Sequence, residues 1–529
     1  MKMNIKKIVF LIFISTFLIT TNTTALNISK SNQTDEIVNI GSTPNQVYKT
    51  LPIKDEDLDP LVDLQVTVTI KEIRAFDDID KYSEPDFYIK LYINNEEFTS
   101  DIWRNQAHIT TPWSKTVDVP DDVEFVNIKI ELWDWDFGIN KLCDIAVNDN
   151  ENQLRRSISV KYSLSSGHWY GDDSITPPGS WWIDYSGYGR ASGCDDNTIY
   201  QNDLDAELYF DITQTDYDGD GIPYWTEVNV YHTDPKVDDT GDDRDQDGVP
   251  IEWEFKWGTL TYERYNHSDG STDAVNYYFY LPYITEDFEL MDDDMDSINN
   301  YEEYLVSEMG SDPYRKDVFV ELDSMDKGPN GEIKSELPAK SKELITIAFN
   351  RQNIVFHLDD GQMGGGEIIP FDTNGNKTDY QEINQIYYDY FLHGNENNWR
   401  RGVFHYGLVL YSTVSAAGFA FRSNAFQISM TGHELMAKKY WADRDIVYAS
   451  AYMHELGHTL GLQWLGGHDR GQMFPSQLGW WLWRNYKSVM NYGYMYGYLV
   501  DLVDFSDGSH GWNDFDDWSN INYYYFEYE

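Results

Sequence analysis

The residue types best suited to chemistry occur in the run MHELGHTLGL at positions 453–462. His454 and His458 are four residues apart, so both imidazoles would lie on one face of a helix and could bind one metal ion. Glu455 would then lie beside the metal, where its carboxylate can accept a proton from a water molecule. Zinc suits this ligand set and lowers the pKa of bound water to about 7. The run therefore predicts a zinc centre for hydrolysis, with Glu455 as the general base.

A second run, SVMNY at 488–492, strengthens this prediction. Gly461, three residues after the second histidine, permits a sharp turn that other residues adopt only at a cost. The two runs together resemble the metzincin superfamily of zinc endopeptidases, in which a tight turn holds a methionine beneath the metal. The resemblance gives that Met-turn role to Met490. It also makes Tyr492 a residue that binds zinc or stabilises the transition state.

The third zinc ligand departs from the metzincin pattern. The family places this ligand three residues after the glycine, where this chain has Trp464, and tryptophan cannot bind zinc. His468 is the preferred replacement, since Gly466 and Gly467 could turn the chain back to the metal. Asp469 is the alternative ligand. A more distant ligand, or a site that has lost its activity, are the remaining interpretations.

Alternating strands and helices between residues 312 and 529 must position these groups. The sequence predicts strands at KDVFVELD, NIVFHLDD and GVFHYGLVLYS, an edge strand over 417–430, helices over 341–352 and 382–391, and a long helix from Arg444 that carries the zinc motif. This order predicts an α/β domain with a mixed sheet. The runs DPYRKDVFVELD, FHYGLVLYS and DFDDWSNI resemble segments of prokaryotic extracellular metzincin-like peptidases. Residues 417–420 would bind an extended substrate as an added strand, or else form an ordinary buried strand.

Three acidic segments between residues 214 and 311 repeat one spacing. Aspartates occupy positions 1, 3 and 5 and a glutamate occupies position 12, which surrounds a hard cation with oxygen ligands. Glycine at position 6 permits the bend, and Ser297 takes that place in the third segment. The predicted calcium ligands are Asp216, Asp218, Asp220, Glu227, Asp243, Asp245, Asp247, Glu254, Asp292, Asp294, Asp296 and Glu303. The segments resemble EF-hand-like and thrombospondin type 3 repeats, which implies a structural role for calcium.

Residues 62–213 contain strand-like runs with alternating apolar side chains, which predict an all-β sandwich. EPDFYIK and LWDWD within this region resemble strand-adjacent motifs of the C2 domain. The resemblance implies further calcium ligands at one end of the sandwich, namely Asp80, Asp86, Asp134, Asp136 and Asp144. Membrane contact would require calcium and this domain, and a scaffold or substrate-positioning role is the preferred alternative.

Composition and the N-terminus indicate an exported protein. The 529 residues include 90 acidic and 39 basic ones, a formal net charge of −51, which excludes nucleic acid as a partner. Residues 1–25 have a basic start and an apolar core typical of a signal peptide, with an uncleaved anchor as the alternative. Residues 26–61 form a polar linker. Export favours a disulfide between Cys143 and Cys194, although two buried thiols are an alternative.

These patterns together predict a multidomain fold, in which a C2-like β-sandwich and a calcium-repeat region precede a metzincin-like α/β domain. The predicted function is a secreted zinc endopeptidase that cleaves proteins or peptides and is stabilised by calcium. The alternative is a calcium-dependent surface adhesion protein whose metzincin-like domain is catalytically inactive. Cleavage specificity, latency and oligomeric state do not follow from the sequence.

Overall fold

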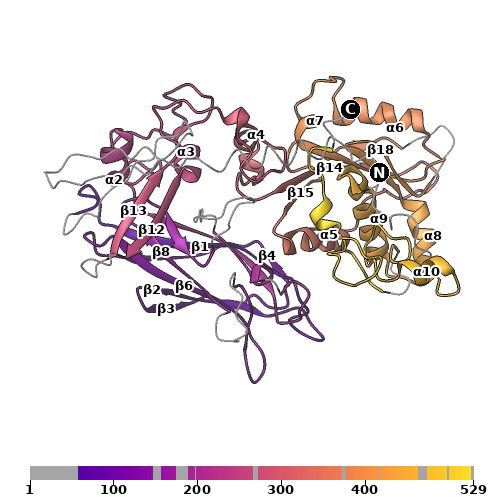
Figure 1. Cartoon of the computed structure of the whole chain (residues 1–529), viewed down its shortest axis with the longest axis horizontal. Helices are drawn as coiled ribbons and strands as arrows, with labels where there is room; N and C mark the ends of the chain where they lie inside the picture. Colours follow the sequence, from indigo (N-terminus) through magenta and orange to yellow (C-terminus); the bar gives the residue numbers. More distant parts are fainter. Residues whose placement is uncertain are drawn as a thin grey trace, which may run out of the picture. The chain divides into compact units, whose positions relative to one another are not determined.

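The computed structural model describes residues 57–146, 156–173, 189–196, 198–265, 272–371, 377–414, 416–462, 474–496 and 500–525 (Figure 1). The predicted signal peptide, most of the predicted linker, and both candidates for the third zinc ligand, His468 and Asp469, lie outside these ranges. Among the helices within the described ranges, none has the length and apolar character needed to cross a lipid bilayer.

Two antiparallel sheets form the region predicted as a β-sandwich. The first has the strand order β10-β11-β1-β4, with β5 also paired to β1, and the second has the order β3-β2-β6-β8-β9, with β7 also paired to β6. The elements are β1 (Gln65–Ala75), β2 (Phe87–Ile93), β3 (Glu96–Thr99), β4 (His108–Ile109), β5 (Trp113–Asp118), β6 (Phe125–Asp134), β7 (Lys141–Leu142), β8 (Ile158–Ser163), β9 (Trp169–Gly171), β10 (Arg190–Ser192), η1 (Gly193–Asp196) and β11 (Ala206–Gln214). Alternate residues of β1, including Val66 and Val68, are buried in one core with Ile89 and Leu91 of β2. The period-two pattern thus corresponds to the inward face of these strands.

Both cysteines of the chain lie buried in this region. Cys143 and Cys194 are free thiols, so the disulfide expected from export is not formed. Burial raises the pKa of each thiol well above its ordinary value, because a thiolate would lose its hydration there. Thiols of this kind are chemically inert, and their packing is the contribution they make to the core.

Short helices and one β-hairpin follow the sandwich, with the three acidic loops between them. The elements are α2 (Tyr224–Thr226), η2 (Glu227–Tyr231), α3 (Ile251–Trp257), β12 (Thr259–Tyr265), β13 (Thr272–Tyr278), η3 (Phe288–Leu290), α4 (Asn300–Leu305) and η4 (Ser307–Met309). Aromatic side chains fill two small cores, in one of which Trp253 packs against Tyr280 and Phe288. Because small cores contribute little stability, the loops themselves must help to hold this region together.

The zinc motif belongs to a domain, here named the zinc-motif domain (residues 312–525), built on a mixed sheet. The sheet has the order β15-β14-β17-β19-β18, with β16 also paired to β14, and β18 alone among these strands is antiparallel to its neighbour. The elements are β14 (Asp317–Met325), α5 (Ala339–Arg351), β15 (Val355–Asp359), β16 (Ile368–Ile369), α6 (Tyr380–Ile386), η5 (Tyr387–Phe391), α7 (Arg400–Val403), β17 (Phe404–Leu410), β18 (Gly418–Arg422), β19 (Ala425–Ser429), α8 (Met430–Tyr440), α9 (Arg444–Thr459), α10 (Leu478–Trp483) and η7 (Trp518–Asn520).

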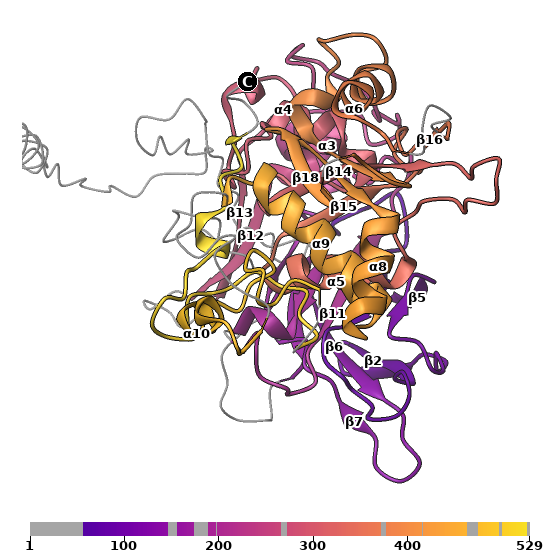
Figure 2. The ribbon, with the colours of Figure 1, turned by 90° about the vertical axis from the view of Figure 1, so that its right-hand side faces the viewer.

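Helices cover both faces of this sheet, and α9 and α5 lie together on one of them (Figure 2). Val318 and Val320 of β14 share a core with Tyr452 of α9. Phe319, between them, belongs instead to the core that contains Tyr387 of η5. β14 is therefore buried on both faces, as expected for a parallel strand between two helical layers. The face that carries Phe319 also carries Glu321 and Asp323, which accept hydrogen bonds from Arg400 and Tyr406. β14, β15 and β17 and the helices α5, α6 and α9 follow the predicted order, whereas α8 occupies a segment for which no helix was predicted.

The segment 417–430 differs from its prediction as a single edge strand. It forms a hairpin, in which β18 lies at the sheet edge and β19 pairs in parallel with β17. Ser423 and Asn424 make the turn, and the carbonyl of Asn424 accepts a hydrogen bond from the backbone N of Tyr406 at 2.7 Å. All five residues of β19 are buried, including the polar Gln427 and Ser429. Periodicity along one strand does not show whether that strand lies at the edge or inside a sheet.

Candidate functional site

Helix α9 carries the predicted zinc ligands to the centre of the zinc-motif domain. The carboxylate of Asp443 caps its first turn by accepting a hydrogen bond from the backbone N of Asp445 at 2.8 Å. Tyr448, Tyr452 and Leu456, each four residues apart, are fully buried in the core beside the sheet. This apolar stripe fixes the rotation of the helix about its axis, and therefore the direction in which the polar residues point.

The side chains of His454, Glu455 and His458 lie close together. One ligand atom from each lies within 4.8 Å of the other two, and the two imidazole rings are 4.9 Å apart at an angle of 88°. Nδ1 of His454 lies 2.8 Å from the carbonyl oxygen of Val489 and must donate a proton to it, because a carbonyl oxygen only accepts. In the neutral imidazole this places the lone pair on Nε2. The residues present therefore fit a zinc ion. The hydrogen bond to Val489 fixes the His454 tautomer whose Nε2 lone pair can bind the metal, as is usual for metal-binding histidines.

Met490, the predicted Met-turn residue, lies against helix α9 at Gly457. It is fully buried, and a Cβ added to Gly457 would come within 2.5 Å of its sulfur. Gly457 is therefore needed for the close approach of the helix to the turn, a role that sequence reasoning did not assign to it. Gly461 has a φ of 78°, which confirms the sharp turn expected after the helix.

Tyr492 lies beside the first histidine of the motif. Its ring stacks on that of His454, with centroids 5.6 Å apart and an interplanar angle of 23°. The side chain is 38% exposed, so it can reach solvent or a bound molecule. This position suits a hydrogen-bond donor close to a metal bound by His454. In the structure, the Tyr492 ring is stacked on the His454 imidazole.

The edge strand β18 passes directly over the predicted general base. A Cβ added to Gly418 would lie 2.4 Å from Oε1 of Glu455, so a larger residue here would displace the Glu455 carboxylate. Glu455 is 4% exposed, and β18 has β19 as its one partner among the strands that the structure describes. Of the residues proposed to bind substrate, 418–420 belong to β18 and Ala417 precedes it.

The three acidic loops share one pattern of hydrogen bonds. The aspartate at position 1 accepts from the backbone N of position 6 at 3.0, 3.1 and 3.3 Å, and the aspartate at position 5 accepts from the backbone N of position 7 at 2.8, 3.0 and 2.8 Å. Position 6 has φ values of 86°, 97° and 76° at Gly221, Gly248 and Ser297. The repeated spacing thus gives three loops of the same conformation, including the one with serine.

Position 12 of each loop is a buried glutamate. Glu227, Glu254 and Glu303 are at most 1% exposed, and each has at least one carboxylate oxygen without a hydrogen-bond partner among the described residues. Burial raises the pKa of Glu227 to about 8 and that of Glu254 to about 10, with neighbouring aspartates adding to the effect. An unpaired buried carboxylate is costly, and a divalent cation would remove that cost. The loops therefore fit calcium.

Glu286 joins the second loop from outside the repeated motif. One ligand atom from each of Asp245, Asp247, Glu254 and Glu286 lies within 4.8 Å of the others. The backbone N of Glu286 donates to the carboxylate of Asp247 at 3.2 Å, and its own Oε2 is buried without a partner among the described residues. Sequence reasoning missed this residue because it lies 32 positions beyond Glu254 and outside any spacing rule.

The acidic end of the sandwich differs from the loops. Asp80, Asp134 and Asp136 come together around the ammonium group of Lys141, which lies 2.5, 3.1 and 2.8 Å from their carboxylates. Although burial lowers the pKa of Lys141, hydrogen bonds to these three aspartates raise it well above its ordinary value. The cluster therefore already holds a positive charge at the place where calcium was predicted.

The two other aspartates predicted for the sandwich site contact different groups. The carboxylate of Asp86 accepts hydrogen bonds from the backbone N of Asn105 at 2.7 Å and from Arg104 at 3.0 Å. That of Asp144 accepts from the backbone N of Ala146 at 3.0 Å and lies 3.3 Å from Arg156. The carboxylates of Asp86 and Asp144 are therefore held by other partners.

Comparisons with known proteins match no family model and no curated protein. Similar solved structures include human GIVD cytosolic phospholipase A2, at 16% identity over 29% of this chain and 16% of that chain, with a TM-score of 0.17. A C2 domain is 13% identical over 29% of this chain and 98% of that chain, with a TM-score of 0.17. A C2 domain of plant Extended Synaptotagmin 1 is 11% identical over 28% and 95%, with a TM-score of 0.16. The chain is β-rich, and the structures similar to part of it include C2 domains.

Proposed function

We propose that this chain is an exported zinc-dependent endopeptidase of the metzincin kind that hydrolyses proteins or peptides. The observation that supports it most is the convergence of His454, Glu455 and His458 beneath the glycine of an open strand edge. Zinc, when bound, supplies a Lewis acid that lowers the pKa of water to about 7. His454 and His458 would hold it, with His468 or Asp469 as the third ligand.

The chemistry of the chain's own residues follows from their positions. The carboxylate of Glu455 accepts the proton of the attacking water and later donates it to the leaving amine. Tyr492 donates a hydrogen bond to the oxyanion of the transition state. The backbone of β18 pairs with an extended peptide and brings the scissile bond over Glu455. Calcium in the three loops stabilises the accessory region (the sandwich and the acidic loops, residues 62–311) against unfolding and self-digestion.

Zinc content tests the metal centre independently of activity. The purified mature chain, kept in calcium, should contain about one zinc per chain, and His454→Ala and His458→Ala should each remove most of it. His393→Ala is the matched control, because that imidazole is 46% exposed and distant in sequence from the motif. Zinc content that is the same in all three variants would contradict the proposed centre.

A second candidate function, membrane contact by the sandwich, is favoured by one observation. Tyr82, Phe137 and Ile139 are 90%, 100% and 85% exposed, and they lie in the loops that contain Asp80 and Asp136, the second of which begins after Asp134. Exposed apolar side chains at loop tips are typical of surfaces that enter a lipid interface. The net charge of −51 disfavours anionic lipids, so a neutral surface is the proposed partner.

Sedimentation with phosphatidylcholine vesicles tests this second candidate. The full chain should bind in calcium, and the double variant Phe137→Ser, Ile139→Ser should lose at least about tenfold in binding, because each side chain loses its apolar burial. Repeating the measurement with a calcium chelator shows whether the ion is needed. Wild type that stays in the supernatant under both conditions would exclude this function.

A further inference from the structure

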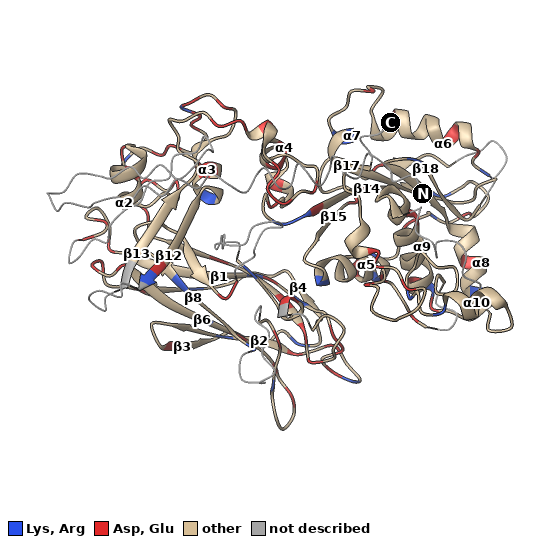
Figure 3. Ribbon diagram, viewed as in Figure 1, with Lys and Arg blue, Asp and Glu red and all other residues tan. Residues whose placement is uncertain are grey.

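The third acidic loop, residues 292–303, contacts the central sheet of the zinc-motif domain. The carboxylate of Asp296 accepts a hydrogen bond at 2.6 Å from the backbone N of Asp317, the first residue of β14. The carboxylate of Asp317 lies 2.5 Å from Nε2 of His357 in the neighbouring strand β15. Asp296, a predicted calcium ligand of the third loop, is therefore hydrogen-bonded to the first residue of β14, the strand between β15 and β17. Acidic residues (red) gather beside α4 at this point of the ribbon (Figure 3).

The same loop also contacts the C-terminal segment, residues 521–525. The hydroxyl of Ser297 donates a hydrogen bond to the carbonyl oxygen of Tyr523 at 3.0 Å. The hydroxyl of Tyr524 donates to the carboxylate of Asp292, position 1 of the loop. Ser297 is the residue that replaces glycine at position 6, so the contact with Tyr523 depends on a side chain that the other two loops lack.

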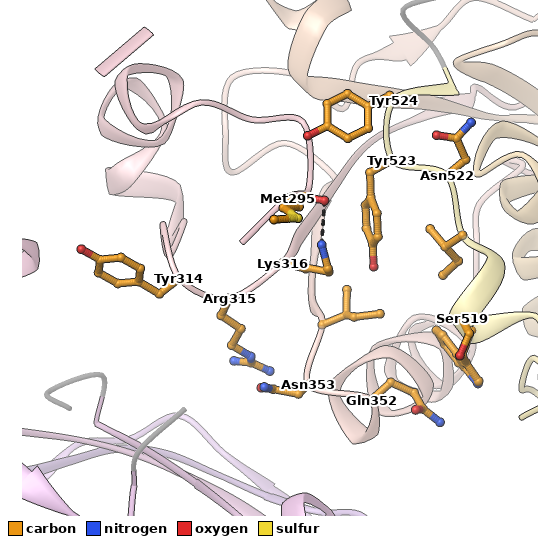
Figure 4. Close-up of a pocket in the computed structure, with 13 residues that line it drawn as sticks. Met295, Tyr314, Arg315, Lys316, Gln352, Asn353, Ser519, Asn522, Tyr523 and Tyr524 are labelled. Carbon is orange, nitrogen blue, oxygen red and sulfur yellow. Dashed lines mark hydrogen bonds between the residues drawn. The ribbon is translucent and has the colours of Figure 1, made fainter. Parts of the chain in front are cut away.

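Lys316 completes the contact between the loop and the C-terminal segment. Its ammonium donates to the carbonyl oxygen of Met295 at 2.6 Å and lies 4.5 Å from the ring centroid of Tyr523, between the two (Figure 4). A cavity of about 500 Å³ remains beside it, lined by these residues together with Asn353 and Ser519. Ile521 and Tyr523 also pack against the core of the zinc-motif domain, so the polar contacts with the loop add to apolar packing of this segment.

Buried charge in this loop points to a bound cation. Asp294 and Glu303 are each 1% exposed, and Asp294 Oδ2 and both oxygens of Glu303 have no hydrogen-bond partner among the described residues. Lys316, the neighbouring cation, directs its ammonium to the backbone carbonyls of Asp294 and Met295. Two buried carboxylates with unpartnered oxygens cannot remain ionised at this place without a further positive charge.

We propose that calcium in the third loop forms the junction between the accessory region and the zinc-motif domain. The ion fixes the loop, and the loop fixes both the start of β14 and the C-terminal segment 521–525. The first and second loops lack this role, since the bonds of their acidic side chains lead to Thr233, Asp239 and Glu286 within the accessory region. The proposal rests on the calcium binding proposed above.

Hydrogen exchange in the full chain tests the junction. Glu303→Gln, in calcium, should speed amide exchange at residues 317–319 and 521–525 by at least about tenfold, because the ordering ion is lost. Glu254→Gln is the matched control, as it removes the same group from the second loop and should leave exchange in both segments within about twofold of wild type. Equal effects of the two variants in both segments would overturn the junction.

A second variant keeps the test independent of any folding defect. Ser297→Gly relieves the positive φ and leaves every predicted ligand in place, so calorimetry should show unchanged calcium binding, while exchange at 521–525 should rise. Unchanged exchange there would overturn the role of Ser297. Calorimetry of wild type separates the proposed calcium binding from the proposed junction. Absence of calcium binding would overturn both of these. Loss of calcium binding in Glu303→Gln, with unchanged hydrogen exchange at 317–319 and 521–525, would overturn the junction alone.

Discussion

The acidic end of the sandwich and the three acidic loops look alike in sequence and differ in structure. Both are clusters of aspartates at short spacing, and both were predicted to bind calcium. In the sandwich, Lys141 lies among the three carboxylates that converge. In the loops, buried glutamates at position 12 have oxygens without partners among the described residues. Acidic spacing alone therefore does not identify a calcium site; the positive charge that the chain itself supplies must also be known.

Removal of calcium should have the largest effect, and it should fall on the loops. Each site stabilises the folded chain by about 4 kcal/mol when free calcium is about 1,000 times its dissociation constant. We expect a chelator to lower the melting temperature of the accessory region strongly, with little direct effect on the sandwich cluster. Calorimetry with and without chelator measures this difference. Equal melting curves in both conditions would contradict calcium binding by the loops.

The calcium-free chain should lose stability as the pH rises. Burial raises the pKa of Glu227 and Glu286 to about 8 and that of Glu254 to about 10, whereas an unfolded glutamate titrates near 4.3. The folded state then holds more protons than the unfolded state from about pH 4.3 to 10, with the largest excess below about pH 8, so the free energy of unfolding falls across this range. Urea titrations at several pH values, with and without calcium, should show a steep fall only without the ion. If the free energy of unfolding changes with pH in the same way with and without calcium, the proposal that these buried glutamates bind calcium is contradicted.

Lys141→Ala should turn the sandwich cluster into a loop-like one. Loss of the ammonium leaves three carboxylates close together, and we expect a cost of about 1–2 kcal/mol, reduced from that of a buried pair because Lys141 is one-third exposed. Added calcium should restore the lost stability in this variant. Lys129→Ala, which removes an exposed lysine paired with a single glutamate, is the control. Loss of stability that calcium does not restore would mean that the cluster lacks the geometry for the ion.

Glu286→Gln should have the smallest effect of these changes. The second loop keeps its four predicted ligands, so we expect calcium affinity to fall about tenfold at one site only. Isothermal titration of the variant against wild type measures the change, with Glu289→Gln as the control because that side chain is exposed. Equal affinities in wild type and Glu286→Gln would exclude Glu286 from the site.

Local patterns predicted the elements well, and distant contacts set the limit. The i, i+4 spacing of His454 and His458 and the alternation in β1 follow from helix and strand periods, which act within a few residues. The hairpin of β18 and β19, the place of Lys141 and the approach of Glu286 to the second loop depend on partners far apart in the chain. Such contacts leave no fixed spacing in one sequence.

The most direct test of the central claim, a zinc-dependent endopeptidase, compares wild type with Glu455→Gln. Both mature chains, in calcium, would be given unfolded casein, and their zinc content would be measured on the same samples. We predict that the variant retains its zinc but loses about 10²- to 10⁴-fold in the rate of peptide-bond hydrolysis, because it lacks the general base. Equal rates in the two chains, or no hydrolysis by zinc-loaded wild type, would contradict the proposed function.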